Sequence, residues 1–238
     1  MALESLYETP KPHAEVAPAA LEFQDVFRIF RSGDVETVAL RGLSLRIEPG
    51  EAVAVAGPSG SGKSTFLHLA AGLDVASAGD IRVQGRSLPR LGEDDLAAYR
   101  ARQVAVVFQR DNLWPGLTAR ENVESSVRLA GGSAASERAV EALRTMGLEH
   151  RMHHRVSALS GGEAQRVAIA AAAARRSRLV LADEPTGELD VANEQVVLEA
   201  LLRLRSELGS TVVVVTHSAP VTDVADRVVE IRDGRAVA

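Results

Sequence analysis

Apolar residues are grouped along the chain in short runs whose spacing predicts an α/β fold. Continuous apolar runs occur within 51–56, 103–109, 179–182 and 211–215. Runs of this length, bounded by turn residues, are typical of strands buried on both faces of a parallel sheet. Helical patterning occupies 64–71 and 194–208. The alternation of the two patterns predicts a mostly parallel sheet joined by helices.

Three other regions depart from this pattern. The chain is strand-like from Leu21, alternates apolar and polar residues over 38–47, and has a further short edge-strand pattern at 79–85, which predicts an antiparallel β flank. Residues 110–158 are charged and helically patterned, most clearly at 137–146, and predict an inserted helical subdomain. Residues 1–20 contain three prolines without periodicity, so we expect a flexible leader before one domain over 21–238.

The most specific chemical signal is a glycine-rich loop between a predicted strand and a predicted helix. Gly57 and Gly62 enclose four residues and are followed by Lys63 and Ser64, which is the phosphate-loop pattern. Glycines let backbone N–H groups face a phosphate, the lysine reaches the outer phosphates, and the hydroxyl can ligate Mg²⁺. We therefore predict a phosphate-loop NTPase core. Its expected nucleotide contacts are Gly57, Ser59, Gly60, Ser61, Gly62, Lys63, Ser64 and Thr65.

Composition narrows the function classes. The net charge of −5 argues against nucleic-acid binding as the main function. The chain has no cysteine, which excludes disulfides and thiolate metal sites. No apolar stretch approaches the ~20 residues that cross a bilayer, and the first residues lack a secretory pattern. We therefore expect a soluble protein whose membrane role comes through a partner.

Two acidic residues follow the apolar run at 179–182. Asp183 and Glu184 would lie at the carboxyl edge of a parallel sheet, where ligands bind in such folds. Asp183 would hold Mg²⁺ and Glu184 would accept a proton from the attacking water. Capping of the following segment is the alternative for this acidic pair.

A second glycine-containing element stands before a long alanine-rich helix. Ser160 and Glu163 form the S-x-x-E pattern of a capping box. The cap does not explain Gly161 and Gly162, because glycine in a first turn costs up to ~1 kcal/mol against alanine. Exposed N–H groups at a helix N-terminus also bind anions, so capping and ligand binding are compatible.

In order and spacing, these elements resemble the ATP-binding-cassette (ABC) ATPases over residues 21–235. The matching elements are 57–65, Gln109, 159–165, Asp183-Glu184, Leu189-Asp190 and His217. The resemblance implies two copies head to tail, with ATP between the phosphate loop of one and Ser160, Gly161, Gly162 and Glu163 of the other. It implies Mg²⁺ at Ser64, Gln109 and Asp183, a catalytic base at Glu184, a γ-phosphate contact at His217, and Asp190 across the dimer interface.

An upstream aromatic residue would stack on the adenine, and Phe30 fits that position best. Phe27 is the second candidate, and core packing is the alternative for both rings. A phenylalanine face does not distinguish adenine from guanine. The preference for ATP therefore comes from the family resemblance.

Finer motifs resemble the lipoprotein-releasing and macrolide-export ATPase subunits, among them 72–74, 121–123 and 182–187. This implies a homodimer at the cytoplasmic face of the membrane, peripheral through a separate permease. Trp114 is expected either in a groove that receives a permease helix or in the core of the helical subdomain. Ala171, where the family commonly has arginine, and Glu188 depart from the pattern.

The competing hypothesis is a soluble ABC ATPase that acts on ribosomes or DNA. Members linked to translation usually carry two cassettes, and repair-type members carry coiled coils or zinc cysteines. This sequence has one cassette pattern and no cysteine. We therefore expect a transporter subunit without a nucleic-acid partner.

Overall fold

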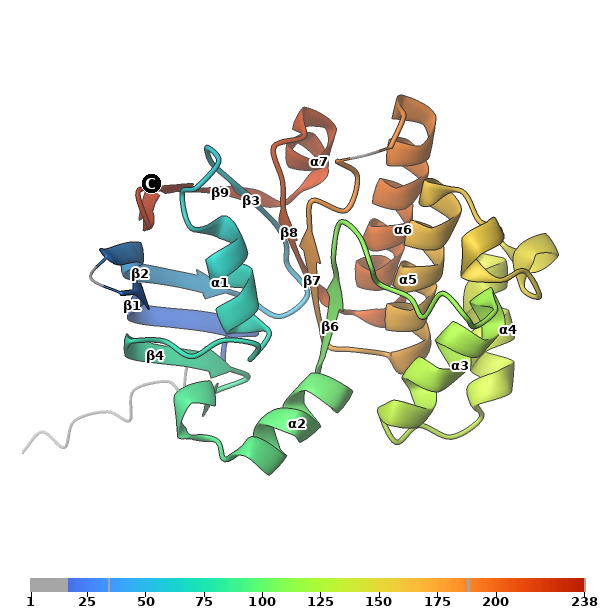
Figure 1. Ribbon diagram of the computed structural model, residues 1–238, viewed down its shortest axis with the longest axis horizontal. Helices are drawn as coiled ribbons and strands as arrows, with labels where there is room; N and C mark the ends of the chain where they lie inside the picture. The colour runs from blue at the N-terminus through green and yellow to red at the C-terminus, as the bar shows by residue number, and fades with distance from the viewer. Residues whose placement is uncertain (1–16, 34, 188, 238) are drawn as a thin grey trace, which may run out of the picture.

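Two β-sheets and the helices between and beside them organise the chain (Figure 1). The computed structural model describes residues 17–33, 35–187 and 189–237. Its strands are β1 (Leu21–Ser32), β2 (Val35–Ile47), β3 (Ala52–Ala56), β4 (Ala78–Val83), β5 (Arg86–Ser87), β6 (Val104–Val107), β7 (Leu179–Asp183), β8 (Thr211–Val215), β9 (Arg227–Arg232) and β10 (Arg235–Val237). Its α-helices are α1 (Lys63–Ala70), α2 (Glu93–Arg102), α3 (Ala119–Leu129), α4 (Ala135–Thr145), α5 (Gly161–Arg175), α6 (Val191–Leu208) and α7 (Ala219–Val224).

The larger sheet confirms the mostly parallel arrangement predicted from the apolar runs. Its strand order is β10-β9-β3-β8-β7-β6, and only the pairing of β10 with β9 is antiparallel. Because β3, β7 and β8 are neighbours and parallel, the loops after these strands meet at one edge. The phosphate loop, the acidic pair and His217 all follow these strands.

Alternate residues of the parallel strands enter different cores. Val53, Val55 and Leu181 pack toward α1 and the antiparallel sheet. Val180 and Ala182 pack on the opposite side with helices α5 and α6. The strands are therefore apolar throughout, because helices cover both faces of the sheet.

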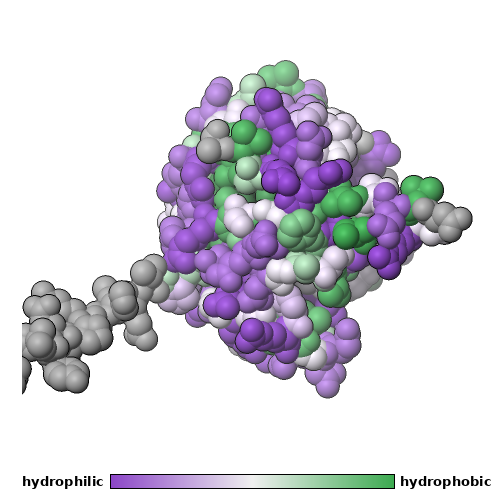
Figure 2. Space-filling view, turned by 90° about the vertical axis from the view of Figure 1, so that its left-hand side faces the viewer, coloured by the Kyte–Doolittle hydropathy of each residue, from purple (hydrophilic) through white to green (hydrophobic). Residues whose placement is uncertain are grey.

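The antiparallel flank is a four-stranded sheet with the order β2-β1-β4-β5. Its inner face lies over α1, where the rings of Phe23 and Phe66 are 4.8 Å apart. Figure 2 views the molecule from the side of this sheet, and hydrophilic residues cover most of that face, with apolar residues in small groups. The one-sided burial explains the alternating pattern of β2.

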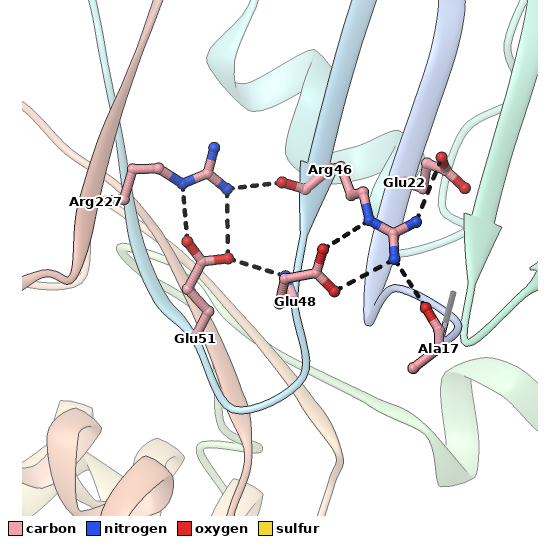
Figure 3. Close-up of polar contacts among 6 residues, drawn as sticks. All are labelled: Ala17, Glu22, Arg46, Glu48, Glu51 and Arg227. Carbon is pink, nitrogen blue, oxygen red and sulfur yellow. Dashed lines mark hydrogen bonds and ion pairs between the residues drawn. The ribbon is translucent and has the colours of Figure 1, made fainter. Parts of the chain in front are cut away.

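Charged side chains join the two sheets (Figure 3). Arg227 on β9 donates Nε to Glu51 Oε1 at 2.8 Å and Nη2 to the carbonyl oxygen of Arg46 at 2.7 Å. Arg46 on β2 in turn contacts Glu48 and donates to the Ala17 carbonyl at 2.8 Å. These contacts hold the antiparallel sheet against β9, which pairs with β3, the strand that precedes the phosphate loop.

The helical part lies at the end of the molecule away from the antiparallel sheet (Figure 1). The expected subdomain at 110–158 contains α3 and α4, and both share an apolar cluster with α5. Helix α5 continues from this cluster to the parallel sheet, so it links the two regions. Among the described residues, no helix combines the length and the apolar content needed to cross a membrane.

The expected leader at 1–20 overlaps the folded region at its end. Ala19 and Ala20 are buried, and Ala20 N donates to Ile47 O at 2.9 Å. Packed chain therefore begins before the expected boundary at Leu21. Residues 1–16 and the unusual Glu188 lie outside the described residues.

Candidate active site

The phosphate loop connects β3 to α1, and its glycines are required by the backbone. Gly57 has φ of 145°, and a Cβ there would lie 2.1 Å from the Ile231 carbonyl oxygen. Gly62 has φ of 106°, and its Cβ would lie 2.5 Å from the Ala39 carbonyl oxygen. Both positions therefore exclude a side chain, so the loop follows the path that the sequence pattern predicts.

Lys63, Ser64 and Thr65 lie at the start of α1, whereas Ser61 lies in the loop before it. Lys63 opens α1, and its Nζ donates to the carbonyls of Gly57 and Pro58 at 2.8 and 3.0 Å. Lys63, Ser64 and Thr65 open the helix, where N–H groups lack intrahelical partners and favour an anion. Ser61 differs, because its hydroxyl is buried without a partner among the described residues and its N–H donates to Pro58.

Ser64 and Asp183 are two of the three predicted Mg²⁺ residues, and Ser64 lies close enough to Asp183 to influence its pKa. Burial raises the pKa of Asp183, while the Ser64 side chain and the positive potential of His68 oppose this shift. A serine hydroxyl and a carboxylate are hard oxygen ligands that suit Mg²⁺. Among the described residues, no three His, Cys, Asp or Glu side chains form a metal cluster.

Glu184 and His217 follow adjacent strands and contact each other directly. His217 Nδ1 lies 2.9 Å from Glu184 Oε1, and the His217 N–H donates to Glu184 Oε2 at 3.4 Å. The Glu184 backbone has φ of 45°, a left-handed conformation that is uncommon for a non-glycine residue. Strain of this kind is concentrated at functional sites. The pair presents a carboxylate, oriented by an imidazole, at the edge beside Asp183.

Gln109 belongs to the loop after β6 and lies close to the segment that follows Glu184. A Cβ at Gly187 would be 3.1 Å from Gln109 Nε2. A cavity of about 400 Å³ joins the two regions, and Gln109, Glu184, Gly161 and Gln165 are among its lining residues. One hollow therefore brings together the predicted base, the predicted glutamine ligand and the start of α5.

The element at 160–163 has the geometry of a capping box. Ser160 Oγ accepts from the Glu163 N–H at 3.2 Å, and Glu163 Oε2 accepts from the Ser160 N–H at 2.9 Å. Arg151 also pairs with Glu163, and the cap and this ion pair lower the pKa of the carboxyl group. A Cβ at Gly162 would lie 2.7 Å from Asn193 Oδ1, so the second glycine permits close approach of α6.

No hydrogen bond between described residues joins the Ser160 element to the phosphate loop. Asp190 acts locally as the N-cap of α6, because its Oδ1 accepts from the Asn193 N–H at 2.9 Å. This bond lowers the pKa of Asp190.

Phe30 and Phe27 differ in exposure on β1. Phe30 is 41% exposed, and the Arg28 guanidinium carbon lies 4.4 Å from its ring centroid. Arg28 is fixed by Asp74 through contacts of 2.7 and 2.8 Å. Phe27 is half-buried and packs near Gly42. Phe30 therefore has the accessible ring that stacking requires.

Trp114 is 51% exposed, so it does not fill the core of the helical subdomain. Val123, Val127 and Leu143 are fully buried in that core instead. Trp114 lines a hollow of about 170 Å³ between β6, α3 and α5, together with Leu113 and other residues. The exposed side chain agrees with the groove alternative.

Sequence analysis assigned no structural role to two polar residues, Asn112 and Gln165, that fix Phe108, the residue before Gln109. Asn112 exchanges hydrogen bonds of 2.7 Å with the backbone N–H and carbonyl of Phe108. Gln165 on α5 also donates to the Phe108 carbonyl, at 2.8 Å, and accepts from Asn112 at 3.1 Å. Gln165 stands between Glu163 and Arg166 in the sequence, so no local pattern indicated that its side chain is buried.

Comparison with known proteins identifies the family. The sequence profile described as "ABC transporter" matches residues 40–187. An uncharacterized ABC transporter ATP-binding protein of Thermotoga maritima is 46% identical over 217 residues, which span 90% of this chain and 92% of that protein. The chain belongs to the ABC transporter family, and it is an ATPase cassette of that family, the nucleotide-binding subunit of a transporter.

Other similar proteins are longer than this chain or have been solved as dimers. The macrolide export ATP-binding/permease protein MacB of Azoarcus sp. is 44% identical over 92% of this chain, but the match covers 33% of that protein. The chain thus spans about a third of the length of this relative. A dimeric structure of the bacterial ABC transporter cassette MJ0796 is 37% identical, with a TM-score of 0.85, and covers 92% of this chain and 97% of that one. A second MJ0796 dimer, in a post-hydrolysis state bound to ADP and Pi, has a TM-score of 0.84.

Proposed function

We propose that two copies of this chain bind ATP with Mg²⁺ head to tail and drive a separate membrane permease of the macrolide-export or lipoprotein-release type. The observation that carries the hydrolytic part is the convergence of four predicted site residues at one sheet edge. Ser64 on α1 lies close enough to Asp183 at the end of β7 to affect its pKa, and Glu184 contacts His217 after the adjacent strands β7 and β8. The dimeric MJ0796 structures and the MacB relatives support the assembly.

The chain's own groups supply positioning and charge. Lys63 and the amides that open α1 would hold the phosphates, and Ser64 and Asp183 would hold Mg²⁺, which neutralises phosphate charge when bound. Glu184 would accept the proton of the attacking water through the carboxylate that His217 orients. His217 would then also contact the γ-phosphate. Phe30 would stack on the adenine, while Ser160, Gly161 and Gly162 would contact the nucleotide of the other subunit.

The groove beside Trp114 is the proposed contact with the permease. It is a partly apolar hollow next to the loop that carries Gln109, so an inserted segment would lie close to a proposed Mg²⁺ ligand. Short helices commonly bind proteins in this way. This contact would place the protein at the cytoplasmic face of the membrane.

The test is an affinity purification with tagged Glu184→Gln chain and ATP from detergent-solubilised membranes of the native cells. Recovery of a multi-spanning membrane protein in stoichiometric amount supports the transporter assignment. Recovery of ribosomal or DNA-associated partners without a membrane protein contradicts it and favours the competing soluble ATPase.

Trp114→Ala tests the groove within the same purification. We expect it to reduce permease recovery while ATP binding stays unchanged, because Trp114 is half exposed and distant in sequence from the phosphate loop. A large loss of thermal stability together with lost recovery would instead indicate a core role.

A further inference from the structure

One carboxylate on α6 joins the loops that carry Glu184 and His217. Glu194 Oε1 accepts hydrogen bonds from Thr186 Oγ1 at 3.2 Å and from Ser218 Oγ at 2.5 Å. Thr186 lies two residues after Glu184, and Ser218 directly follows His217. The two loops follow the adjacent parallel strands β7 and β8. A single oxygen atom on a third element therefore links both halves of the proposed catalytic pair.

Helix α6 does not require this carboxylate for its own cap. Asp190 Oδ1 accepts from the Asn193 N–H at 2.9 Å, and Asn193 Nδ2 donates to the same oxygen at 3.1 Å. Asn193 occupies the capping-box position, so Glu194 lies one residue beyond it. An acid near a helix N-terminus is favoured by the helix dipole whatever else it contacts. Neither the cap nor the dipole therefore explains why this side chain binds the two loops.

The two hydroxyl groups bind Glu194 in place of other partners. Ser218 is the N-cap residue of α7, where a serine oxygen usually accepts from the first turn of the helix, but this bond is absent. The Ser218 hydroxyl donates to Glu194 instead. Thr186 is 4% exposed, so its hydroxyl has to be bonded within the protein, and it also donates to Glu194. The bridge is thus the use that the fold makes of both hydroxyls.

We propose that Glu194 is a positioning residue for ATP hydrolysis, which fixes the loops of Glu184 and His217 through Thr186 and Ser218. This inference rests on the proposed function, because it assigns Glu194 to the support of the proposed base. The Glu184 backbone has φ of 45°, a conformation that persists only where surrounding contacts hold it. Hydrogen bonds to a carboxylate are stronger than bonds between neutral groups. The bridge supplies such bonds to both loops at once.

The test is steady-state ATPase kinetics of the native chain and of two substitutions at Glu194. We expect Glu194→Ala to lower kcat about tenfold at a temperature where it is fully folded, because a small displacement of the catalytic pair misaligns the attacking water. Since Glu194 is not proposed to touch the nucleotide, KM for ATP should change less than about twofold. Glutamine keeps an acceptor oxygen at the same place, so Glu194→Gln should recover most of the lost kcat.

A double-mutant cycle with Ser218→Ala shows whether Glu194 acts through the bridge. Ser218→Ala should lower kcat by less than Glu194→Ala does, because the bond from Thr186 remains. The double variant should have about the kcat of Glu194→Ala alone, since both substitutions break the same bridge. The control Glu199→Ala removes an exposed carboxylate from the same helix, which accepts from Gln195 at 3.3 Å, and should behave like the native chain.

The outcomes separate this inference from the proposed function when Glu184→Gln is assayed alongside. Native kcat in both Glu194→Ala and Ser218→Ala, with turnover lost in Glu184→Gln, overturns the bridge and leaves the proposed base intact. Independent effects of Glu194→Ala and Ser218→Ala on kcat overturn the bridge as well. Near-native turnover in Glu184→Gln overturns the proposed base, and the positioning role of Glu194 with it. Ser218→Ala removes one hydroxyl and no helix cap, so it tests the bridge even where Glu194→Ala folds poorly.

Discussion

Replacement of Gln165 by leucine should loosen the loop that carries Gln109. Gln165 is buried, its Nε2 donates to the Phe108 carbonyl at 2.8 Å, and its Oε1 accepts from Asn112 at 3.1 Å. Leucine has a similar size and removes both bonds. Each bond contributes about 1 kcal/mol net, so the free energy of unfolding should fall by about 2 kcal/mol. In a chain of this size, that corresponds to a melting temperature lower by about 4–8 °C.

Gln165→Leu should also lower kcat, by more than partial unfolding of the variant can explain. Phe108 precedes Gln109, so a displaced Phe108 carbonyl moves a proposed Mg²⁺ ligand. We expect kcat to fall about tenfold at a temperature where the variant is fully folded. Urea denaturation gives the stability change, and steady-state ATPase assays give kcat and KM.

A matched control and a double-mutant cycle make this prediction specific. Gln195→Leu changes an exposed glutamine on α6 and should alter stability by less than about 0.5 kcal/mol. Gln165→Leu combined with Asn112→Ala should show a coupling energy of about 0.5–1 kcal/mol, because the two side chains share the Phe108 carbonyl. An unchanged urea midpoint, or additive effects of the two substitutions, would refute the clamp.

Two further predictions concern the nucleotide site. Burial raises the pKa of Asp183, so this carboxyl stabilises the fold below its ordinary pKa and loses that contribution as pH rises through the raised value. The melting temperature of the ligand-free Asp183→Asn variant should therefore exceed that of the native chain at pH 7.5 by more than it does at pH 4.5, while Mg²⁺-dependent ATP binding is weakened. A variant that melts below the native chain at pH 7.5 would contradict this. Phe30→Ala should weaken ATP binding about tenfold through lost stacking, whereas Phe27→Ala should mainly lower the stability of the fold. Calorimetric titration with ATP measures both affinities. A larger loss of ATP affinity in Phe27→Ala than in Phe30→Ala would mean that Phe27 is the stacking residue.

The strands and the phosphate loop were predictable because their signals are local. The runs at 179–182 and 211–215 are apolar throughout, since both sheet faces are covered, and β7 and β8 match them closely. Gly57 and Gly62 are required by backbone geometry that their pattern already encodes. Helix α2 escaped notice because it buries only Tyr99, so it has little apolar periodicity.

Contacts between distant segments were not predictable from one sequence. Nothing local indicates that Arg175 reaches the end of α2, or that Gln165 binds the Phe108 carbonyl. Asp190 was assigned only to the dimer interface, although Asp before a helix is also a common N-cap, the role it has here. The left-handed backbone of Glu184 is likewise visible only in three dimensions.

The most direct test of the central claim is the behaviour of the Glu184→Gln chain with Mg²⁺ and ATP. Light scattering after size-exclusion chromatography should show an ATP-dependent dimer, and ATP turnover should fall about 10²–10⁴-fold relative to the native chain. A variant that stays monomeric with bound ATP would contradict the head-to-tail pair. Near-native turnover would remove Glu184 from the role of catalytic base.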